Sequence, residues 1–541
     1  MGPLREVLLQ VDRLSFARLR FATTMLRNSV IPTLALSLLA AAPAAAQAQG
    51  EDMLLLKDGR IFLDVELVTT PEGEVTVQFE NGEVHVPGHL IQEALDLDAP
   101  PPAPKNAEEE AKIAEGLLMY QGKWVSASKR DKMFRDEIED RREELVSIQD
   151  SQLWRNRSFE KTKHFEFEYT VPPHVFEIYR DQLEAYFKVF AKDWKVKPPK
   201  DNPRLKICMY VTESDFLQIG GVPKGVLGYF RFVDPMELNF FYDRRDPVFT
   251  TEVLFHEANH YMQKLIDLEF KMPHFPGEAI AEYYGGAHWD VDKKKLTVGL
   301  VLPSRLVEVK TDIATGKYWG LEELVSADEV YQHYTWGWTL AHFLMKSKKH
   351  EKNFKKFVMA LAEDKKVRRE SVSIGAIPLK MVRGSEVWEA FRRFMKIETD
   401  EAVKELEKEW HDYIDNELKV EGVRAKEAAG VRAVKGYPRQ MIRGKRLLSE
   451  AVEEGSTSPI VYQTLGEIFY DDRDYAKAAE LFEKAVSFDP LEPGYTFWHG
   501  MALKRLGQSE EGQQRIELAK EMGINDPSLR WLLELEDELD D

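Results

Sequence analysis

The chain has 541 residues, enough for three or four domains, and its content of 43% hydrophobic and 31% charged residues is ordinary for a globular protein. Its net charge of −19 argues against nucleic acid as a partner. The only cysteine is Cys208, which excludes an intrachain disulfide, a cysteine-rich metal site and a lipoprotein cysteine after a signal.

Residues 1–48 read as a signal peptide with an upstream extension. Arg27 supplies a positive charge, Ile31 to Ala42 form a short apolar run, and small residues at 44–48 offer a cleavage site. Met25 is then the expected initiator, and an uncleaved N-terminal anchor is the alternative. Elsewhere, no stretch is apolar and long enough to cross a bilayer. We therefore expect a secreted or periplasmic protein of a bacterial cell envelope, with no transmembrane span after signal cleavage.

Residues 51–98 are expected to form a small all-β domain. Apolar and polar residues alternate along several short runs, and Asp58-Gly59 and Asn81-Gly82 are hairpin signals. This pattern favours a compact SH3-like β-barrel, whose role the sequence does not indicate. Residues 99–160 follow as a Pro-rich linker and a charged helix, with a break at Gly122 to Val125 inside the helical run.

Residues 161–420 contain the elements around the candidate site. Residues 164–169 alternate as a strand, residues 175–194 form an amphipathic helix, and the nearly continuous apolar run 205–211 predicts a central strand. A further strand, Leu238 to Tyr242, comes just before the helix that carries the main motif. We expect this strand or its hairpin partner to be the sheet edge that pairs with an extended substrate.

The main motif is His256-Glu257-Ala258-Asn259-His260, an H-E-x-x-H sequence. Residues four apart on a helix lie about 40° apart around its axis, so His256 and His260 can reach one metal ion together. Asp246-Pro247 is a suitable helix start, and the apolar residues that follow have helical spacing. Glu257 is placed to take a proton from a metal-activated water. The pattern predicts a Zn²⁺ site.

A catalytic zinc site needs a third protein ligand and an open position. Glu278 is the candidate, 18 positions after His260 on a second helix entered after Pro273 and Pro276. Glu282 lies one turn further along the same helix face. It can accept a hydrogen bond from the second ring nitrogen of a ligand histidine.

The two motifs together resemble the gluzincin zinc metallopeptidases of the thermolysin and aminopeptidase N types. A closer resemblance, over about residues 160–420, is to secreted bacterial peptidases with a peptidase-MA-like domain. The stretches that carry it are Lys163-His164-Phe165-Glu166-Phe167, Gly228-Tyr229-Phe230, Thr251 to Glu257, Gly277 to Tyr284 and Tyr334-Thr335-Trp336-Gly337-Trp338.

The resemblance implies that His256, His260 and Glu278 bind zinc and that Glu257 is the general base and then the acid. It also implies that Tyr334, which opens a Tyr-x-x-Gly segment, stabilises the oxyanion. Tyr331 and His333 are alternatives, because a phenol or an imidazolium can both donate to an oxyanion. Gly277 differs from the family, which usually has a polar residue before the ligand glutamate, and the spacing from His260 to Glu278 is one residue shorter than in aminopeptidases.

Residues 421–541 carry a repeat of 34 residues. Gly466 and Gly500 are 34 apart, and so are Phe482 and Ile516. The positions of Leu465, Gly466, Phe469, Ala478, Phe482, Ala485 and Pro490 resemble the tetratricopeptide pattern. Such arrays commonly bind proteins, so a protein partner at the helical repeats is expected; the alternative is that they only cover the catalytic domain.

The sequence thus predicts an α+β protein. Its zincin-type catalytic domain, a mixed sheet with active-site helices, follows a small SH3-like β-barrel and precedes an α-helical repeat array. The expected function is that of a zinc metallopeptidase acting on a peptide or protein substrate. Two alternatives are a non-catalytic scaffold that works through the repeats, and a zinc amidase acting on cell-wall material.

Overall fold

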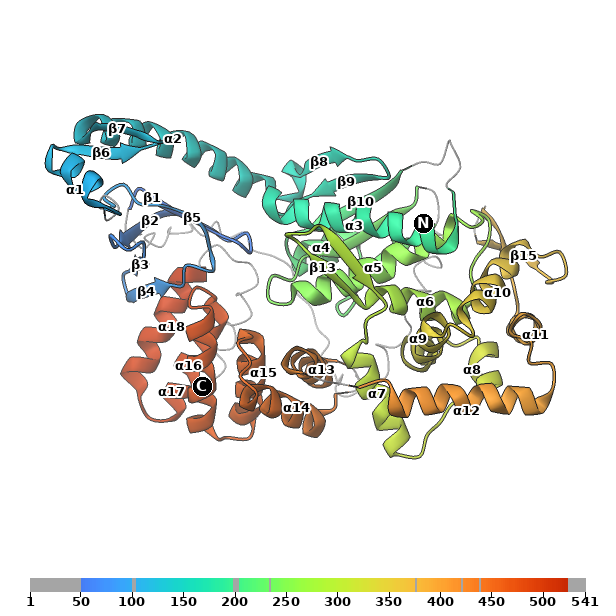
Figure 1. Cartoon of the computed structure of the whole chain (residues 1–541). Coiled ribbons are helices and arrows are strands. Elements are labelled where there is room, and N and C mark those ends of the chain that lie inside the picture. Colours follow the sequence, from blue (N-terminus) through green and yellow to red (C-terminus); the bar gives the residue numbers. More distant parts are fainter. Residues whose placement is uncertain are drawn as a thin grey trace, which may run out of the picture.

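The computed structural model describes residues 50–99, 104–197, 204–232, 235–374, 377–419, 422–436 and 439–523. The protein is α+β: along the sequence, an antiparallel sheet (blue) comes first, a mixed sheet follows, and a run of helices (orange to red) comes after it (Figure 1). The predicted signal peptide, residues 1–48, lies outside the described residues, as do residues 100–103 of the Pro-rich linker. None of the described helices is both long enough and apolar enough to cross a membrane.

The N-terminal sheet is antiparallel in the order β4-β3-β2-β1-β5, and among the described strands β4 and β5 are its edges. The strands are β1 (Asp52–Leu56), β2 (Ile61–Thr69), β3 (Val75–Phe79), β4 (Gly82–Val86) and β5 (Ile91–Leu95). Alternate residues of a strand point to opposite faces. Leu54 and Leu56 of β1 join one apolar cluster and Met53 and Leu55 another, so β1 is buried along its whole length.

The charged segment after this sheet is two helices separated by a hairpin rather than one interrupted helix. Helix α1 (Ala107–Ala114) precedes strands β6 (Leu117–Tyr120) and β7 (Lys123–Ser126), which pair around the predicted break. Helix α2 (Ala127–Ser151) then runs from this hairpin to the mixed sheet (Figure 1). Ile138 and Leu145 of α2 pack against the N-terminal sheet, so α2 also covers one of its faces.

The mixed sheet has the order β11-β12-β10-β9-β8. Its strands are β8 (Ser158–Lys161), β9 (Phe165–Tyr169), β10 (Leu205–Tyr210), β11 (Gly228–Arg231) and β12 (Glu237–Phe241). The predicted central strand is confirmed, because β10 lies between β9 and β12 and is parallel to both. Of the two strands proposed as the edge, β12 is paired on both sides, and its antiparallel partner β11 is the edge.

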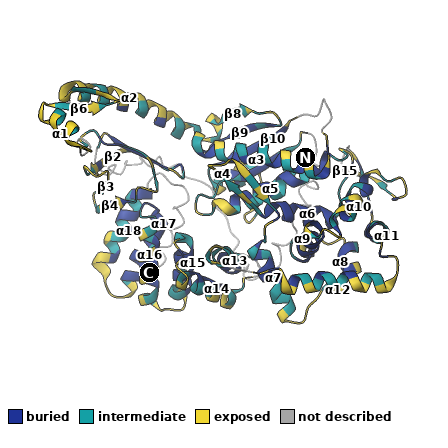
Figure 2. Ribbon diagram, viewed as in Figure 1, coloured by how far each residue is buried: buried dark blue, intermediate teal, exposed yellow. Residues whose placement is uncertain are grey.

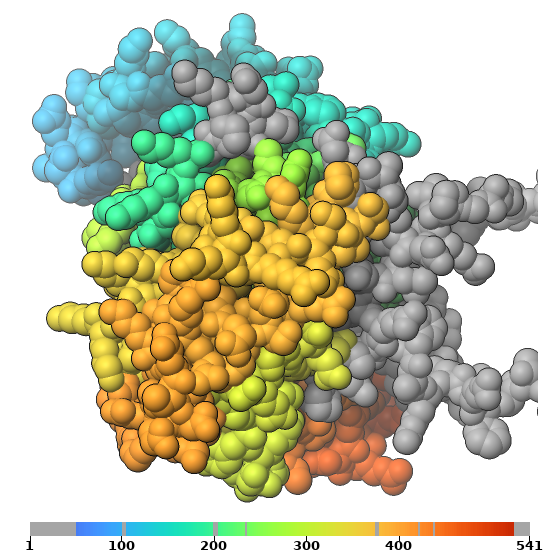
Figure 3. Space-filling view, turned by 90° about the vertical axis from the view of Figure 1, so that its right-hand side faces the viewer, coloured from blue at the N-terminus to red at the C-terminus, as the bar shows by residue number. Residues whose placement is uncertain are grey.

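Helices and short hairpins complete the middle region. They are α3 (Pro173–Trp194), α4 (Glu213–Gly220), α5 (Pro247–Lys264), α6 (His274–Gly285), β13 (Ala287–Asp290), β14 (Lys295–Val298), α7 (Pro303–Ala314), α8 (Leu321–Ser326), α9 (Trp338–Lys346), α10 (Glu351–Glu363), β15 (Glu370–Ile374), β16 (Ile377–Met381), α11 (Gly384–Met395) and α12 (Asp400–Asn416). One apolar cluster extends from Phe165 to Leu418. Figure 2 shows α6 and α9 mostly buried, whereas α1 and the adjoining part of α2 are mostly exposed. Residues of α10 to α12, yellow to orange, cover the end of the molecule shown in Figure 3.

The C-terminal helices form pairs: α13 (Val423–Lys435) with α14 (Met441–Glu453), α15 (Pro459–Asp471) with α16 (Tyr475–Phe488), and α17 (Pro493–Arg505) with α18 (Ser509–Gly523). We call α13–α18 the helical array. Helices α15 and α17 begin 493 − 459 = 34 residues apart, as the sequence repeat requires. Leu518 and Met522 of α18 pack into the N-terminal sheet, so the last helix of the array is covered by the first strands of the chain.

Candidate metal centre

Helix α5 carries the two histidines of the motif. A side-chain oxygen of Asp246 accepts a hydrogen bond from the N–H of Phe249 at 3.0 Å, and Pro247 occupies the first turn, as predicted for this helix start. The apolar side of α5 is buried in the core of the middle region. His256 and His260 are half-buried, with 14% and 24% of their side-chain surfaces exposed.

Helix α6 carries Glu278 and Glu282 and packs against α5. Gln263 of α5 donates a hydrogen bond to the carbonyl oxygen of Gly277 at 2.8 Å, which fixes the start of α6 next to the second histidine. A Cβ atom at Gly277 would lie 3.5 Å from Met272, an ordinary van der Waals distance. The glycine at this position therefore does not result from a lack of space, and Glu278 reaches the histidines with it in place.

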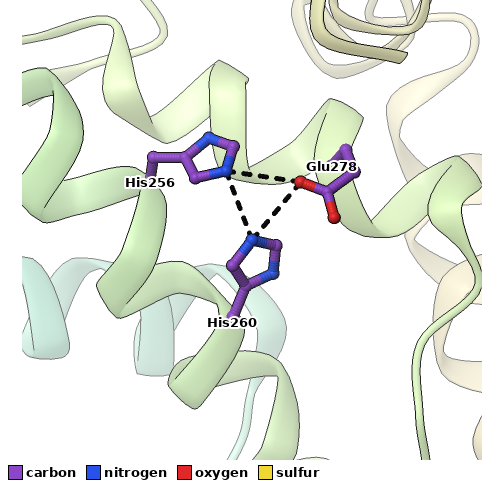
Figure 4. A group of neighbouring side chains, drawn as sticks. All are labelled: His256, His260 and Glu278. Atoms are coloured by element: carbon purple, nitrogen blue, oxygen red, sulfur yellow. Dashed lines mark hydrogen bonds and ion pairs between the residues drawn. The ribbon is translucent and has the colours of Figure 1, made fainter. Parts of the chain in front are cut away.

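The three predicted ligands come together at one point (Figure 4). The Nε2 atoms of His256 and His260 are 3.2 Å apart, and each is 3.3 Å from Oε2 of Glu278. In a tetrahedral zinc site with metal–ligand distances of about 2.0–2.1 Å, the ligand atoms lie about 3.3–3.4 Å from one another. The triangle therefore has the size of one face of a zinc tetrahedron.

The environment of Glu278 also fits a cation. Its Oε2 atom is buried and faces the two imidazole Nε2 atoms at 3.3 Å, but among the described residues it has no hydrogen bond of good geometry. A buried carboxylate oxygen without a well-formed hydrogen bond is unfavourable, and such an atom in a native protein usually has a role. Two imidazoles and one carboxylate are suitable ligands for zinc, so the donor set and its geometry agree.

The charges of the three predicted ligands and of Glu282 depend on one another. Burial disfavours the charged form of His256, but the neighbouring carboxylates of Glu278 and Glu282 prevail and raise its pKa to about 10. Burial likewise opposes ionisation of Glu278, but His260 and His256 hold its pKa well below the usual range. The site therefore favours an ionised Glu278, the form that binds a metal.

Glu282 lies beside His256, where the sequence placed it, and it has a second partner that the sequence did not indicate. Its Oε1 atom lies 3.2 Å from Nδ1 of His256. Arg305 of α7 donates to both oxygens of Glu282, at 2.7 and 2.9 Å. Although burial opposes ionisation, Arg305 and His256 lower the pKa of Glu282 to about 2. Arg305 was missed because no sequence spacing links α7 to α6.

Glu257 lies beside the edge strand of the mixed sheet. A Cβ atom at Gly228 of β11 would be 3.4 Å from Cγ of Glu257 and 2.7 Å from Val253. The absence of a side chain at Gly228 lets β11 approach α5 closely at Val253, one turn before Glu257. The predicted general base and the predicted substrate-pairing edge are therefore neighbours.

Of the three candidates for the oxyanion donor, Tyr334 has a ring contact with His256. Its ring centroid is 5.7 Å from that of His256, and the Arg305 guanidinium lies 5.4 Å above its ring. Tyr331 is 41% exposed and stands 6.5 Å from Tyr334, ring to ring. His333 is fully buried, and burial lowers its pKa to about 4, so it does not supply an imidazolium at neutral pH.

No protein-family model matches the chain, and a search of curated proteins finds no match either.

Proposed function

We propose that the protein is a zinc-dependent peptidase, in which His256, His260 and Glu278 hold the metal. The observation that carries the proposal is the triangle of three donor atoms, 3.2 to 3.3 Å on each side, with Glu257 next to it. Zinc bound there would lower the pKa of a water molecule toward 7 and polarise a scissile carbonyl group.

The residues around the metal would divide the remaining work. Glu257 takes the proton of the attacking water and then transfers it to the leaving amine. Tyr334 donates a hydrogen bond to the oxyanion. Glu282, itself held by Arg305, keeps His256 oriented toward the metal. The edge of β11 aligns the extended substrate beside Glu257.

The same proposal includes the type of each domain and the location of the protein in the cell. The middle region would be a zincin-type domain, the N-terminal sheet an SH3-like barrel and the helical array a set of tetratricopeptide repeats. The order β5-β1-β2-β3-β4 and the 34-residue helix spacing support the last two assignments. A secreted or periplasmic location rests on the signal-like composition of residues 1–48.

The proposal is tested with the full-length protein by changing Glu257→Gln. We expect one zinc ion per chain to remain bound, while hydrolysis of a mixed peptide library falls about 10²- to 10⁴-fold, the usual contribution of general acid–base catalysis. Glu322→Gln, an exposed carboxylate on α8, is the matched control. Full activity of Glu257→Gln would refute the assigned mechanism.

The oxyanion donor is tested by Tyr334→Phe. This change should lower kcat with little effect on KM, because the hydrogen bond is made only in the transition state. Tyr331→Phe is the matched control. If Tyr331→Phe lowers kcat and Tyr334→Phe does not, the assignment belongs to Tyr331.

The same experiments separate the other two functions. Zinc binding with activity on cell-wall fragments but not on peptides would identify an amidase. If the protein takes up no zinc, even after incubation with it, the result would favour the non-catalytic scaffold, in which the helical array carries the function.

A further inference from the structure

Helix α13, the first helix of the array, directly contacts α5, the helix that carries His256 and His260 and that we call the zinc helix. The guanidinium of Arg432 on α13 lies 3.6 Å above the ring of Phe249 on α5. Its Nη2 atom is 3.9 Å from Oε2 of Glu252, also on α5. One side chain of the array thus combines a cation–π contact with an ion pair on the first half of α5.

The contact lies close to the ligands along the helix. Glu252 is four residues before His256, so the two side chains lie on nearly the same face of α5, one turn apart. Burial raises the pKa of Glu252 to about 7, and Arg432 acts against this rise. The charges around Glu252 are Arg432, Arg305, Asp246 and Glu282, so Arg432 belongs to the same charge network as the carboxylate that orients His256.

Helix α13 also packs against α7, the helix that carries Arg305. Val307 of α7 forms an apolar cluster with Ala429 of α13 and Leu447 of α14. Thr311 of α7 donates a hydrogen bond to Gln440, just before α14, at 3.1 Å. The array therefore contacts α5, which carries His256, and α7, which carries the Arg305 that holds Glu282.

A third contact holds the segment that leads into α5. Arg244 donates to Oε2 of Glu492 at 2.8 Å, and Glu492, directly before α17, is 4% exposed. Arg60 of the N-terminal sheet lies 3.8 Å from the same carboxylate and donates to Asp489 at 2.9 Å. The array thus fixes the entry of α5 and its second turn.

We propose that the helical array braces the zinc helix and that Arg432 is a positioning residue, which acts through Glu252 and Phe249 to hold His256 and His260 in ligand geometry. The inference rests on the proposed function, because it assigns the array to the same zinc site. It makes the array an internal part of the metal centre in addition to any surface for a protein partner.

The test compares two full-length variants, Arg432→Gln and Arg446→Gln. Arg446 pairs with Glu450 within α14 at 2.7 Å, so its loss removes an ion pair that lies within one helix of the array. Zinc affinity is measured by competition with a chelator. Hydrogen–deuterium exchange of the α5 amides is measured on the metal-free proteins, and the melting temperature shows that each variant is folded.

For Arg432→Gln we expect zinc affinity to fall on the order of tenfold, the lower end of the effects seen for residues that support a metal ligand. We also expect the α5 amides to exchange faster. Arg446→Gln should match the wild type in both measurements. Arg432→Lys keeps the charge but loses the planar face on Phe249, so its zinc affinity and α5 exchange should lie between those of Arg432→Gln and the wild type. It replaces Arg432→Gln in the test if that variant does not fold.

Equal zinc affinity and equal α5 exchange in Arg432→Gln and Arg446→Gln would overturn the brace, even if the protein hydrolyses peptides. Faster α5 exchange in Arg432→Gln alone would support it, even if no peptide is cleaved. The exchange measurement needs neither zinc nor activity, so failure of the brace and failure of the proposed function give different results.

Discussion

Two helix pairs in this chain pack closely for different reasons. Helices α15 and α16 meet at Gly466, where a Cβ atom would lie 2.6 Å from the ring of Phe482, and their contact is apolar. Helices α5 and α6 meet at polar groups, among them Gln263 and Glu278, and one buried carboxylate oxygen there faces two imidazole nitrogens at 3.3 Å. The first arrangement serves stability, whereas the second arranges groups that a metal can bind.

Among changes at the contact between α5 and α6, Glu278→Ala is expected to have the largest effect on zinc binding. Loss of the third ligand should weaken zinc binding more than about 100-fold, beyond the range typical of residues that only support a ligand. Glu269→Ala, a carboxylate 62% exposed just after α5, is the control. Metal content after dialysis is the measurement, and a Glu278→Ala protein that retains zinc would exclude the three-ligand site.

A smaller effect is expected from Arg305→Gln. Glu282 would keep its place beside His256 but lose the two hydrogen bonds that hold it, so zinc affinity should fall about 10- to 100-fold. Arg393→Gln, which removes a partly buried ion pair with Asp364, should leave the zinc affinity unchanged. Chelator competition distinguishes them, and equal affinities would show that Arg305 only stabilises the fold.

Zinc uptake should depend on pH through His256. Its pKa is raised to about 10, so at neutral pH the ring is protonated, and zinc must displace that proton because it binds the neutral imidazole. The apparent zinc affinity should therefore rise about tenfold per pH unit between pH 7 and 8, with release of about one proton per zinc. Calorimetry in buffers of different ionisation enthalpy counts the protons, and uptake without proton release would contradict the raised pKa.

Changes at the apolar contact between α15 and α16 should alter the stability of the protein and leave zinc binding unchanged. Gly466→Val introduces a side chain against Phe482 and should cost about 1–3 kcal/mol of unfolding free energy, as overpacking does elsewhere. Gly88→Val, at an exposed position with no atom within 4 Å of the added Cβ, should cost much less. Zinc affinity should be unchanged in both variants. A loss of zinc binding in Gly466→Val would mean that the array affects the metal centre through its own packing as well as through Arg432.

Local sequence rules were sufficient where neighbouring residues decide the structure. The spacing of His256 and His260 on one helix face, the helix start at Asp246-Pro247 and the central position of the apolar strand β10 all follow from such rules. The break at Gly122 was recognised, but its hairpin was not, since two four-residue strands carry little periodic signal.

What the sequence by itself determined is therefore the set of donor residues and the helices that carry them. Tertiary structure decided how these helices meet: the 3.3 Å approach of Glu278 to both histidines, the bidentate hold of Arg305 on Glu282, the position of β11 as the sheet edge and the contact of Arg432 with α5. The physical reason is the separation along the sequence of the residues that interact. Helix faces and caps depend on residues three or four positions apart, whereas these contacts join elements that only the packing of a shared core and a long-range charge network bring together.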